Sequence, residues 1–255
     1  MKLLELQLPS PAEQLAADEA LLDAAESGRD GEMLLFWEPR ETFVVVGYAN
    51  KVATEVNLAA CEKAGVPVFR RCSGGGTIVQ MPGGLNYSLI LRIQENSPTR
   101  NISSANSFIM EKNRAAIESI LPSSHLSSPV SKIAVRGHTD LTLITRHPSL
   151  VTEKKFAGNS QRRRKNFLLF HGTLLLNCDL NSIGDLLLMP SLAPDYRLGR
   201  SHKDFVTNLG LPAEKIKAAF AQAWGANEEF KKSPLTEIKK LAQEKYSTRE
   251  WNFKF

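Results

Sequence analysis

The residues best suited to chemistry in this chain form a basic, glycine-rich segment. It reads Arg70-Arg71-Cys72-Ser73-Gly74-Gly75-Gly76-Thr77 and follows a short apolar run that predicts a strand. Three successive glycines leave backbone N–H groups uncovered and permit positive φ, so a ligand can approach the main chain closely. The two arginines add forked donors suited to a carboxylate or a phosphate. A plain flexible turn is the alternative interpretation, and these residues alone leave it open.

A second basic segment contains the lysine with the best position to reach a ligand. It reads Glu153-Lys154-Lys155-Phe156-Ala157-Gly158-Asn159-Ser160-Gln161 and predicts a strand. On a regular strand Lys155, Ala157 and Asn159 share one face, so the amine would reach over small neighbours. Alternatively, the lysines protect an edge strand against aggregation. The adjoining run Arg162-Arg163-Arg164-Lys165 is interpreted as a solvated hairpin tip that would attract an acidic protein, with an active-site clamp as the alternative.

Two further segments carry polar groups next to apolar strands. Phe170-His171-Gly172-Thr173-Leu174 interrupts an apolar strand, and glycine inside a buried strand often marks close approach of a ligand or another backbone. The histidine is either a pocket residue or a satisfied structural side chain. Asp140, which ends Gly137-His138-Thr139-Asp140, would orient a lysine or hold a metal ion, although turn chemistry explains it equally well.

The composition limits the classes of protein to consider. A chain of 255 residues with 42% hydrophobic and 23% charged residues fits one large globular domain. No apolar run approaches the ~20 residues that span a bilayer, and the first residues do not resemble a signal peptide. Three widely spaced cysteines predict neither a disulfide framework nor a zinc site, so we expect a reducing cytoplasm. The net charge of +5 suits an acidic protein partner or a phosphate-bearing ligand, and we expect no nucleic-acid or membrane partner.

Helices and hairpin-spaced strands must position these segments. Ser10-Pro11-Ala12-Glu13 predicts the capped start of a helix that ends at Gly28, with Leu15, Leu22 and Ala25 on its buried stripe. Further helices are expected at residues 57–64, 104–121, 183–189, 212–224 and 235–245, the last introduced by Ser233-Pro234. Strands are expected at residues 33–37, 42–47, 66–71, 77–79, 86–93, 140–144, 155–159 and 167–177. This mixture predicts an α+β fold with a largely antiparallel sheet covered by helices.

Taken together, the segments resemble the lipoate–protein ligase A family, which has the biotin/lipoate ligase fold and is similar to class II synthetases. Five segments run in the family's order between residues 70 and 175: residues 70–76, 86–88, 137–141, 155–161 and 171–175. Two more lie near the end: residues 206–209 and 246–252. The resemblance covers residues 15–252 and implies a single catalytic domain over residues 1–255, helical from about residue 205, without a separate C-terminal accessory domain.

The resemblance implies an ATP-dependent activation of lipoate and transfer of the acyl group to a lysine of a carrier domain. Lys155 matches the family's essential lysine, which contacts the acyl carboxylate and the α-phosphate. Asp140 matches the acid of the nucleotide site, where Mg²⁺ would accompany ATP, and no separate metal motif is expected. The other residues expected to bind substrate or nucleotide are Arg70, Arg71, Ser73, Gly74, Gly75, Gly76, Thr77, Asn86, Gly158, Asn159, His171, Gly172 and Thr173. The strand containing residues 44–46 is expected to form one wall of an apolar tunnel for the lipoyl chain.

Two departures from the family pattern affect these expectations. Gln80-Met81-Pro82 stands where the family has His-Asp, so the role of that imidazole is missing. A one-domain member is expected either to need an accessory protein or to perform only the transfer step. The resemblance implies a monomer whose partners are lipoyl domains of 2-oxoacid dehydrogenase E2 subunits or the glycine cleavage H protein.

Two other functions stay open. One is a cysteine-dependent octanoyl or lipoyl acyltransferase of the same fold, for which Cys72 and Cys178 are the candidate nucleophiles, while Cys61 is expected to pack in a helix. The other is a protein that binds lipoate or a lipoyl domain without turnover.

Overall fold

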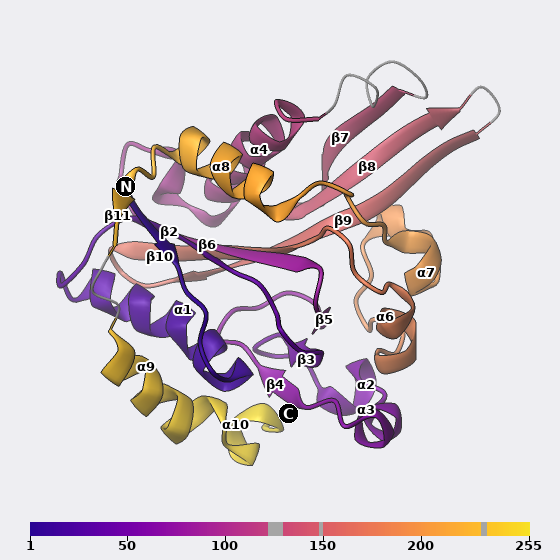
Figure 1. Cartoon of the computed structure of the whole chain (residues 1–255), viewed down its shortest axis with the longest axis horizontal. Coiled ribbons are helices and arrows are strands. Elements are labelled where there is room, and N and C mark those ends of the chain that lie inside the picture. The colour runs from indigo at the N-terminus through magenta and orange to yellow at the C-terminus, as the bar shows by residue number, and fades with distance from the viewer. Residues whose placement is uncertain (122–129, 148–149, 231–233) are drawn as a thin grey trace.

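The computed structural model describes residues 1–121, 130–147, 150–230 and 234–255. Its central feature is a large sheet with strand order β11-β1-β2-β6-β10-β9-β8-β7 (Figure 1). Pairing is antiparallel from β2 to β7, whereas β1 pairs in parallel with both β2 and β11. The strands are β1 (Lys2–Glu5), β2 (Met33–Trp37), β6 (Gly84–Arg92), β7 (Val130–Arg136), β8 (Asp140–His147), β9 (Leu150–Arg163), β10 (Phe167–Leu175) and β11 (Glu228–Glu229). The predicted α+β fold with a largely antiparallel sheet is therefore confirmed.

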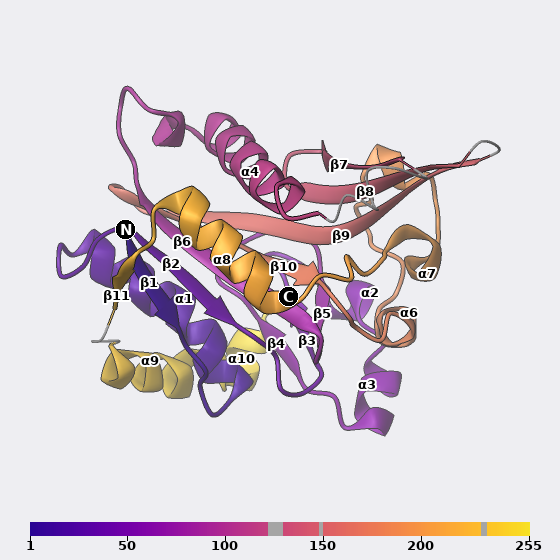
Figure 2. The ribbon, with the colours of Figure 1, turned by 45° about the horizontal axis from the view of Figure 1, so that its top comes forward.

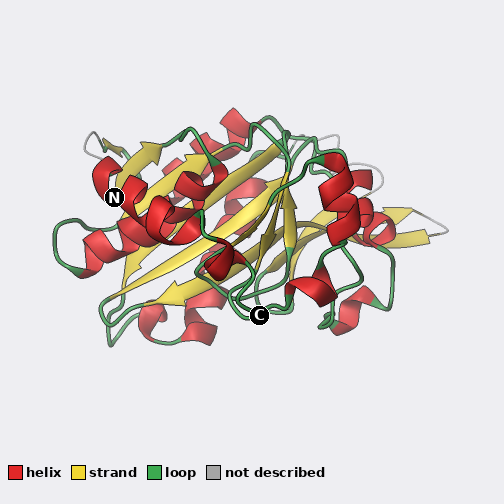
Figure 3. Cartoon of the chain, turned by 90° about the horizontal axis from the view of Figure 1, so that it is seen from below, coloured by secondary structure: helices red, strands yellow, loops and turns green. Residues whose placement is uncertain are grey.

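Helices cover both faces of this sheet (Figures 1 and 2). On one face, α4 and α8 enclose a core built on β6 and β10, and on the other α1 and α9 enclose a second core. Helices α2, α3, α6 and α7 lie together near one end of the sheets (Figure 1), and the view from below shows helices flanking the strands (Figure 3). The helices are α1 (Pro11–Glu26), α2 (Val52–Glu55), α3 (Leu58–Ala64), α4 (Ile102–Glu118), α6 (Asn181–Leu186), α7 (His202–Phe205), α8 (Ala213–Trp224), α9 (Leu235–Leu241) and α10 (Arg249–Asn252).

A three-stranded sheet carries the glycine-rich segment. Its order is β4-β3-β5, with β3 (Phe43–Val46) between β4 (Val68–Arg70) and β5 (Ile78–Gln80). Because β3 is buried at every position, it anchors this sheet in the interior. The chain between β4 and β5, residues 71–77, is the glycine loop, and its ends are fixed by two strands that both pair with β3.

The first helix forms as its sequence predicts. The Ser10 hydroxyl accepts a hydrogen bond from the Glu13 amide at 3.3 Å, which is the expected helix cap, and it donates to the Glu13 carboxylate at 3.1 Å. Leu15 and Leu22 are buried against the sheet. Asp18 is buried on the same stripe, so this helix places a carboxylate inside an otherwise apolar face.

Several elements differ from the prediction. Strands β1, β7 and β11 were not expected, and β9 is much longer than residues 155–159. The interpretation of the lysine segment as an edge strand is wrong, because β9 lies between β8 and β10. Ser233, expected to introduce the last helix, lies outside the described residues. Among the described helices, none has the length and apolar character needed to cross a bilayer.

Candidate active site

A cavity of about 520 Å³ lies between the large sheet and the glycine loop. Its floor comes from β6, β9 and β10, and its sides come from the glycine loop with β5, the turn at residues 137–139 and residues 187–206. Val45 of β3 also lines it, as expected for a tunnel wall. A volume of this size suits a small molecule or cofactor.

The glycine loop faces the cavity with its backbone. Gly75, Gly76 and Thr77 line the cavity, and Gly75 has a φ of 83°, which favours glycine. No described group accepts a hydrogen bond from the amides of residues 74–76, so these donors are free for a ligand. The loop thus presents an uncovered row of N–H groups, as the sequence predicted.

Arg71 shapes this loop from within. Its guanidinium donates to the Gly74 carbonyl at 2.5 Å and to the Gly76 carbonyl at 2.7 Å. Burial lowers the pKa of Arg71 to about 10, so the side chain stays cationic at neutral pH. Arg71 lines the cavity, but its donors hold the loop and are not free for a substrate.

Lys155 reaches the cavity because β9 contains a bulge. Leu141 pairs with Ala157 and Thr142 pairs with Lys155, so Phe156 is an extra residue between them. Phe156 and Ala157 both belong to the core under α4 and α8, whereas Lys155 lies over Gly158 on the cavity side. The expected face shared by Lys155, Ala157 and Asn159 is therefore wrong, since the bulge reverses the alternation after Lys155.

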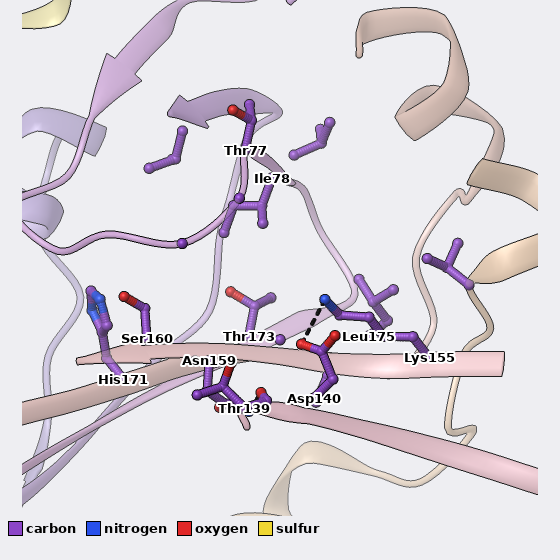
Figure 4. Close-up of a pocket in the computed structure, with 18 of the residues that line it drawn as sticks. Thr77, Ile78, Thr139, Asp140, Lys155, Asn159, Ser160, His171, Thr173 and Leu175 are labelled. Atoms are coloured by element: carbon purple, nitrogen blue, oxygen red, sulfur yellow. Dashed lines mark hydrogen bonds and ion pairs between the residues drawn. The ribbon is translucent and has the colours of Figure 1, made fainter. Parts of the chain in front are cut away.

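Asp140 and Tyr196 surround the lysine, and we call Lys155, Asp140 and Tyr196 the cation end of the cavity. The Lys155 Nζ lies 2.8 Å from Asp140 Oδ1, and the Tyr196 hydroxyl donates to Asp140 Oδ2 at 2.5 Å (Figure 4). Burial and the charge of Asp140 raise the pKa of Tyr196, so its hydroxyl remains a donor. Side-chain exposure is 27% for Lys155 and 14% for Asp140, which leaves the amine open to a ligand.

Three connected residues, Ser73, His171 and Asp18, lie at the other end of the cavity, and we call them the relay end. His171 and Asp18 line the cavity, whereas Ser73 is buried beside it. Ser73 Oγ lies 2.5 Å from His171 Nε2, and His171 Nδ1 lies 2.6 Å from Asp18 Oδ2. Ser88 donates to the other Asp18 oxygen at 2.6 Å. With its proton on Nδ1, the imidazole would donate to the Asp18 carboxylate and accept the serine hydroxyl at Nε2. Figure 4 shows His171 and Ser160 at one end of the sheet wall and Lys155 with Asp140 at the other.

A neutral network lies between the two ends. Gln80 donates to Asn86 Oδ1 at 2.7 Å and to Thr173 Oγ1 at 2.8 Å, and Asn86 donates back to Gln80 at 2.9 Å. All three line the cavity. Gln80 stands where the expected pattern has histidine, so this part of the wall carries no titratable group.

Comparison with known proteins identifies the family. A sequence model described as the lipoyl protein ligase A/B catalytic domain matches residues 10–224. The chain belongs to this family. It is 30% identical, over 96% of this chain and 96% of the relative, to "Octanoyltransferase LipM" of Carboxydothermus hydrogenoformans. It is 26% identical, over 98% and 95%, to "Lipoate-protein ligase A subunit 1" of Thermoplasma acidophilum.

A solved structure supports the fold of the family. It is described as a bi-partite lipoate protein ligase and its E2 lipoyl domain from Thermoplasma acidophilum. The TM-score is 0.78 at 22% identity, covering 99% of this chain and 95% of the other. The family includes both ligases and transferases, so membership alone leaves the reaction open.

Two residues expected in the pocket of this lipoyl ligase family member support it from behind. Asn159 points away from the cavity and donates through Nδ2 to the Thr139 carbonyl at 2.7 Å. Its backbone N–H binds the same carbonyl at 3.0 Å, which fixes the turn that presents Asp140. Gly172 leaves room for Asn159, because a Cβ there would lie 1.7 Å from Asn159 Oδ1. The close approach predicted at Gly172 is therefore that of a side chain, on the face opposite the cavity.

Arg70 has a structural role, which corrects its expected place in substrate binding. It is fully buried, and its side chain donates to carbonyls of residues 47, 48, 50, 251 and 252. Arg70 therefore joins the C-terminal segment to the chain after β3. Adjacent arginines serve different regions because successive side chains leave an extended chain on opposite sides.

The basic run at residues 162–165 is less solvated than expected. Strand β9 continues through Arg163, and residues 162–164 are half-buried. Arg164 forms ion pairs with Asp23 at 2.8 Å and Glu19 at 3.3 Å, which attach the hairpin to α1. Lys165 alone in this run is exposed.

None of the three cysteines of this family member lines the cavity. Burial, together with the charges of Glu19 and Asp18, raises the pKa of Cys72 to about 12. Burial also raises the pKa of Cys178 and of Cys61. The candidate nucleophiles Cys72 and Cys178 are therefore protonated and enclosed, the opposite of an activated thiolate.

Sequence reasoning missed Asp18, Gln80 and Tyr196. Asp18 had a signal: it lies three residues after Leu15, on the stripe that the sequence predicts to be buried. A carboxylate on such a stripe needs a partner. Tyr196 had none, since only the path of residues 187–206 along β9 brings it to Asp140.

Proposed function

We propose that this protein is a lipoate–protein ligase. It would activate lipoate with ATP to lipoyl-AMP and transfer the lipoyl group to a lysine of a carrier domain. The observation that supports this function best is the cation end: an accessible Lys155 amine in a cavity whose glycine loop has free amides and whose wall has no thiol. Charge and amides serve an acyl phosphate, whereas a cysteine-dependent transferase needs an accessible thiolate.

The chemistry explains the need for these groups. A carboxylate does not acylate an amine at neutral pH, because it is a poor electrophile. In the ligase reaction a lipoate oxygen attacks the α-phosphorus of ATP, the bond to pyrophosphate breaks, and an acyl adenylate forms. The acceptor amine then attacks the acyl carbon, and AMP leaves. Lys155 would stabilise the charge on the phosphate and carboxyl oxygens, and the amides of residues 74–76 would do so from the opposite wall.

Two carboxylates line the cavity, Asp140 and Asp18. Mg²⁺ requires only one or two carboxylates when phosphate oxygens and water complete its coordination. Asp140 fits the ion that accompanies ATP better than Asp18, because the Asp140 side chain is 14% exposed and that of Asp18 only 6%. Bound Mg²⁺ would neutralise phosphate charge, and Asp140 would then exchange its contact with Lys155 for the ion.

The acceptor is proposed from the relatives. The carriers would be lipoyl domains of E2 subunits, one of which accompanies the Thermoplasma acidophilum ligase, or the glycine cleavage H protein. The Thermoplasma ligase is described as bi-partite, which supports an accessory protein for this chain as well. All three cysteines are free thiols, in keeping with a cytoplasmic setting.

Lipoate-dependent exchange of labelled pyrophosphate into ATP tests this function on the purified chain. We expect exchange that requires lipoate and ATP, followed by lipoyl transfer to an apo-lipoyl domain. The matched arm replaces lipoate and ATP with an octanoylated carrier protein. Transfer in that arm with no pyrophosphate exchange would contradict the ligase, and binding of lipoate with inactivity in both arms would indicate a non-catalytic protein.

The second candidate is an octanoyltransferase. The relative of that name at 30% identity favours it. The protonated, enclosed state of Cys72 and Cys178 argues against a cysteine-dependent form of the reaction.

A further inference from the structure

We propose that Ser73 is an acyl-accepting nucleophile, activated by His171 and Asp18, which allows the cavity to take an acyl group from a thioester without ATP. This activity goes beyond the ligase function and does not depend on it. At the relay end a hydroxyl, an imidazole and a carboxylate from three distant elements form one hydrogen-bonded chain, and this chain supports the proposal.

The order of the chain is that required for nucleophilic catalysis. The glycine loop supplies Ser73, β10 supplies His171 and α1 supplies Asp18. The two contacts measure 2.5 Å and 2.6 Å, both within hydrogen-bond range. Asp18 fixes the imidazole with its proton on Nδ1, so Nε2 is free to take the hydroxyl proton. Ser88 satisfies the second Asp18 oxygen, which keeps the carboxylate oriented.

Groups that stabilise an oxyanion surround the serine. The amide of Gly74 directly follows Ser73, and the residue after a nucleophilic serine is a common oxyanion donor. No described group accepts a hydrogen bond from this amide or from those of Gly75 and Gly76. Arg71 Nε lies 3.1 Å from Ser73 Oγ, so a permanent cation lowers the cost of developing negative charge on that oxygen.

The cavity reaches the relay end from one side. His171, Asp18, Arg71 and Gly75 line it, while Ser73 is only 1% exposed. An acyl carbonyl therefore reaches Ser73 Oγ only when residues 74–76 move outward. These residues are exposed. Their outward movement would break the bond from Ser160 Oγ to the Gly74 carbonyl at 2.9 Å and the bonds from Arg71 to the Gly74 and Gly76 carbonyls at 2.5 Å and 2.7 Å.

The proposed step balances with an acyl thioester as the donor. Ser73 Oγ attacks the thioester carbon while His171 Nε2 takes the hydroxyl proton. The carbon–sulfur bond breaks, the proton passes to the departing thiolate, and an acyl-serine ester and a free thiol result. An acceptor amine then attacks the ester, its proton returns to Ser73 Oγ through His171, and an amide forms.

The test uses octanoyl-pantetheine as the donor and the full chain without ATP. We expect the mass of the protein to increase by one octanoyl group, peptide mapping to place it on Ser73, and neutral hydroxylamine to leave it in place, as an ester requires. A fluorophosphonate probe, which a serine nucleophile does not release, should label the same residue. Absence of the fluorophosphonate adduct, or an octanoyl group on a cysteine or on Lys155, would overturn the proposal.

Variants show whether labelling of Ser73 depends on His171 or only on a reactive probe reaching a serine hydroxyl. Ser73→Ala should lose both adducts, and His171→Gln should slow labelling at least ~100-fold, the usual contribution of a general base. Ser119→Ala is the matched control, because its hydroxyl donates to the Ala116 carbonyl at the end of α4 and lies outside the cavity. Labelling of Ser119→Ala should equal that of the wild type. Unchanged labelling of His171→Gln would show that the relay does not activate Ser73.

The outcome is independent of the ligase reaction. Lys155→Ala should keep the Ser73 adducts while losing pyrophosphate exchange. Exchange without adducts refutes only the serine proposal, and adducts without exchange refute only the ligase. If Ser73→Ala fails to fold, the mapped site in the wild type decides alone.

Discussion

The two ends of the cavity hold similar residue types under different conditions. At the cation end the Lys155 side chain is 27% exposed, and its partner Asp140 also contacts Tyr196. At the relay end His171 is 12% exposed and Asp18 6%, and each group bonds to the next. The Lys155 ammonium must stay accessible, because it has to leave Asp140 and contact a phosphate. A proton relay, in contrast, needs its three side chains in fixed contact with one another. Exposure thus separates a group that exchanges partners from groups that keep them.

The largest effect is expected from breaking the cation end. Lys155→Ala removes the accessible amine, and loss of one preorganised donor typically costs about 3–4 kcal/mol of barrier, or 10²–10³ in kcat. Lipoate-dependent pyrophosphate exchange measures this loss. Lys154→Ala is the matched control, since it removes the same charge one residue away, and it should keep near wild-type exchange. Equal losses in both variants would mean that only the net charge of β9 matters.

A smaller loss, of stability, is expected from disturbing the support behind the cation end. In Gly172→Ala the new Cβ would lie 1.7 Å from Asn159 Oδ1 and 2.9 Å from the Gly158 carbonyl. Overpacking of this kind typically costs about 1–3 kcal/mol, which denaturant unfolding measures. Gly184→Ala in α6 is the control, because nothing lies within 4 Å of its Cβ. A Gly172→Ala variant as stable as Gly184→Ala would show that Asn159 moves aside freely.

The sequence was sufficient for the pieces of the site and insufficient for their orientation. The glycine loop, Lys155 and Asp140 could be predicted because their segments follow one another in the order of a known family. The face of Lys155 could not, since the extra residue Phe156 follows no pattern of alternation. Arg70 and Arg71 are identical by type, and only β4 decides that one serves the C-terminal segment and the other the loop.

Long-range contacts account for most of what the sequence did not reveal. Asp18 and His171 are separated by 153 residues, and Tyr196 lies 56 residues after Asp140. Neither pair has a local signature, because the sheet order brings the elements together. The fold class was accessible from local patterns, whereas the relay end required tertiary structure.

A modest effect is expected from sharpening the role of Tyr196 at the cation end. Tyr196→Phe removes only the hydroxyl and keeps the ring that packs 5.3 Å from Phe205. Loss of one hydrogen bond to a charged group, about 1.5 kcal/mol, predicts a roughly tenfold fall in kcat/KM for ATP. Burial and the charge of Asp140 raise the pKa of Tyr196, so its hydroxyl is still protonated at a pH equal to the ordinary tyrosine pKa of about 10. The ratio of wild type to variant should therefore be constant from neutral pH to about 10, and a ratio that changes there would contradict this assignment.

The smallest effect on activity is expected from the thiols, which test whether the relay end uses sulfur. Cys72 adjoins Ser73 but lies outside the cavity, and burial raises its pKa to about 12, so Cys72→Ala should retain both pyrophosphate exchange and Ser73 labelling.

The Cys72 thiol should instead affect the stability of the protein at alkaline pH. A folded pKa above the unfolded value of about 8.5 stabilises the protein fully below that value, and this stabilisation is lost as pH rises toward 12. Wild type should therefore lose unfolding free energy more steeply than Cys72→Ala across that range. Loss of exchange or of labelling in Cys72→Ala would instead place a thiol in the chemistry and undo the contrast between an accessible amine and an enclosed serine.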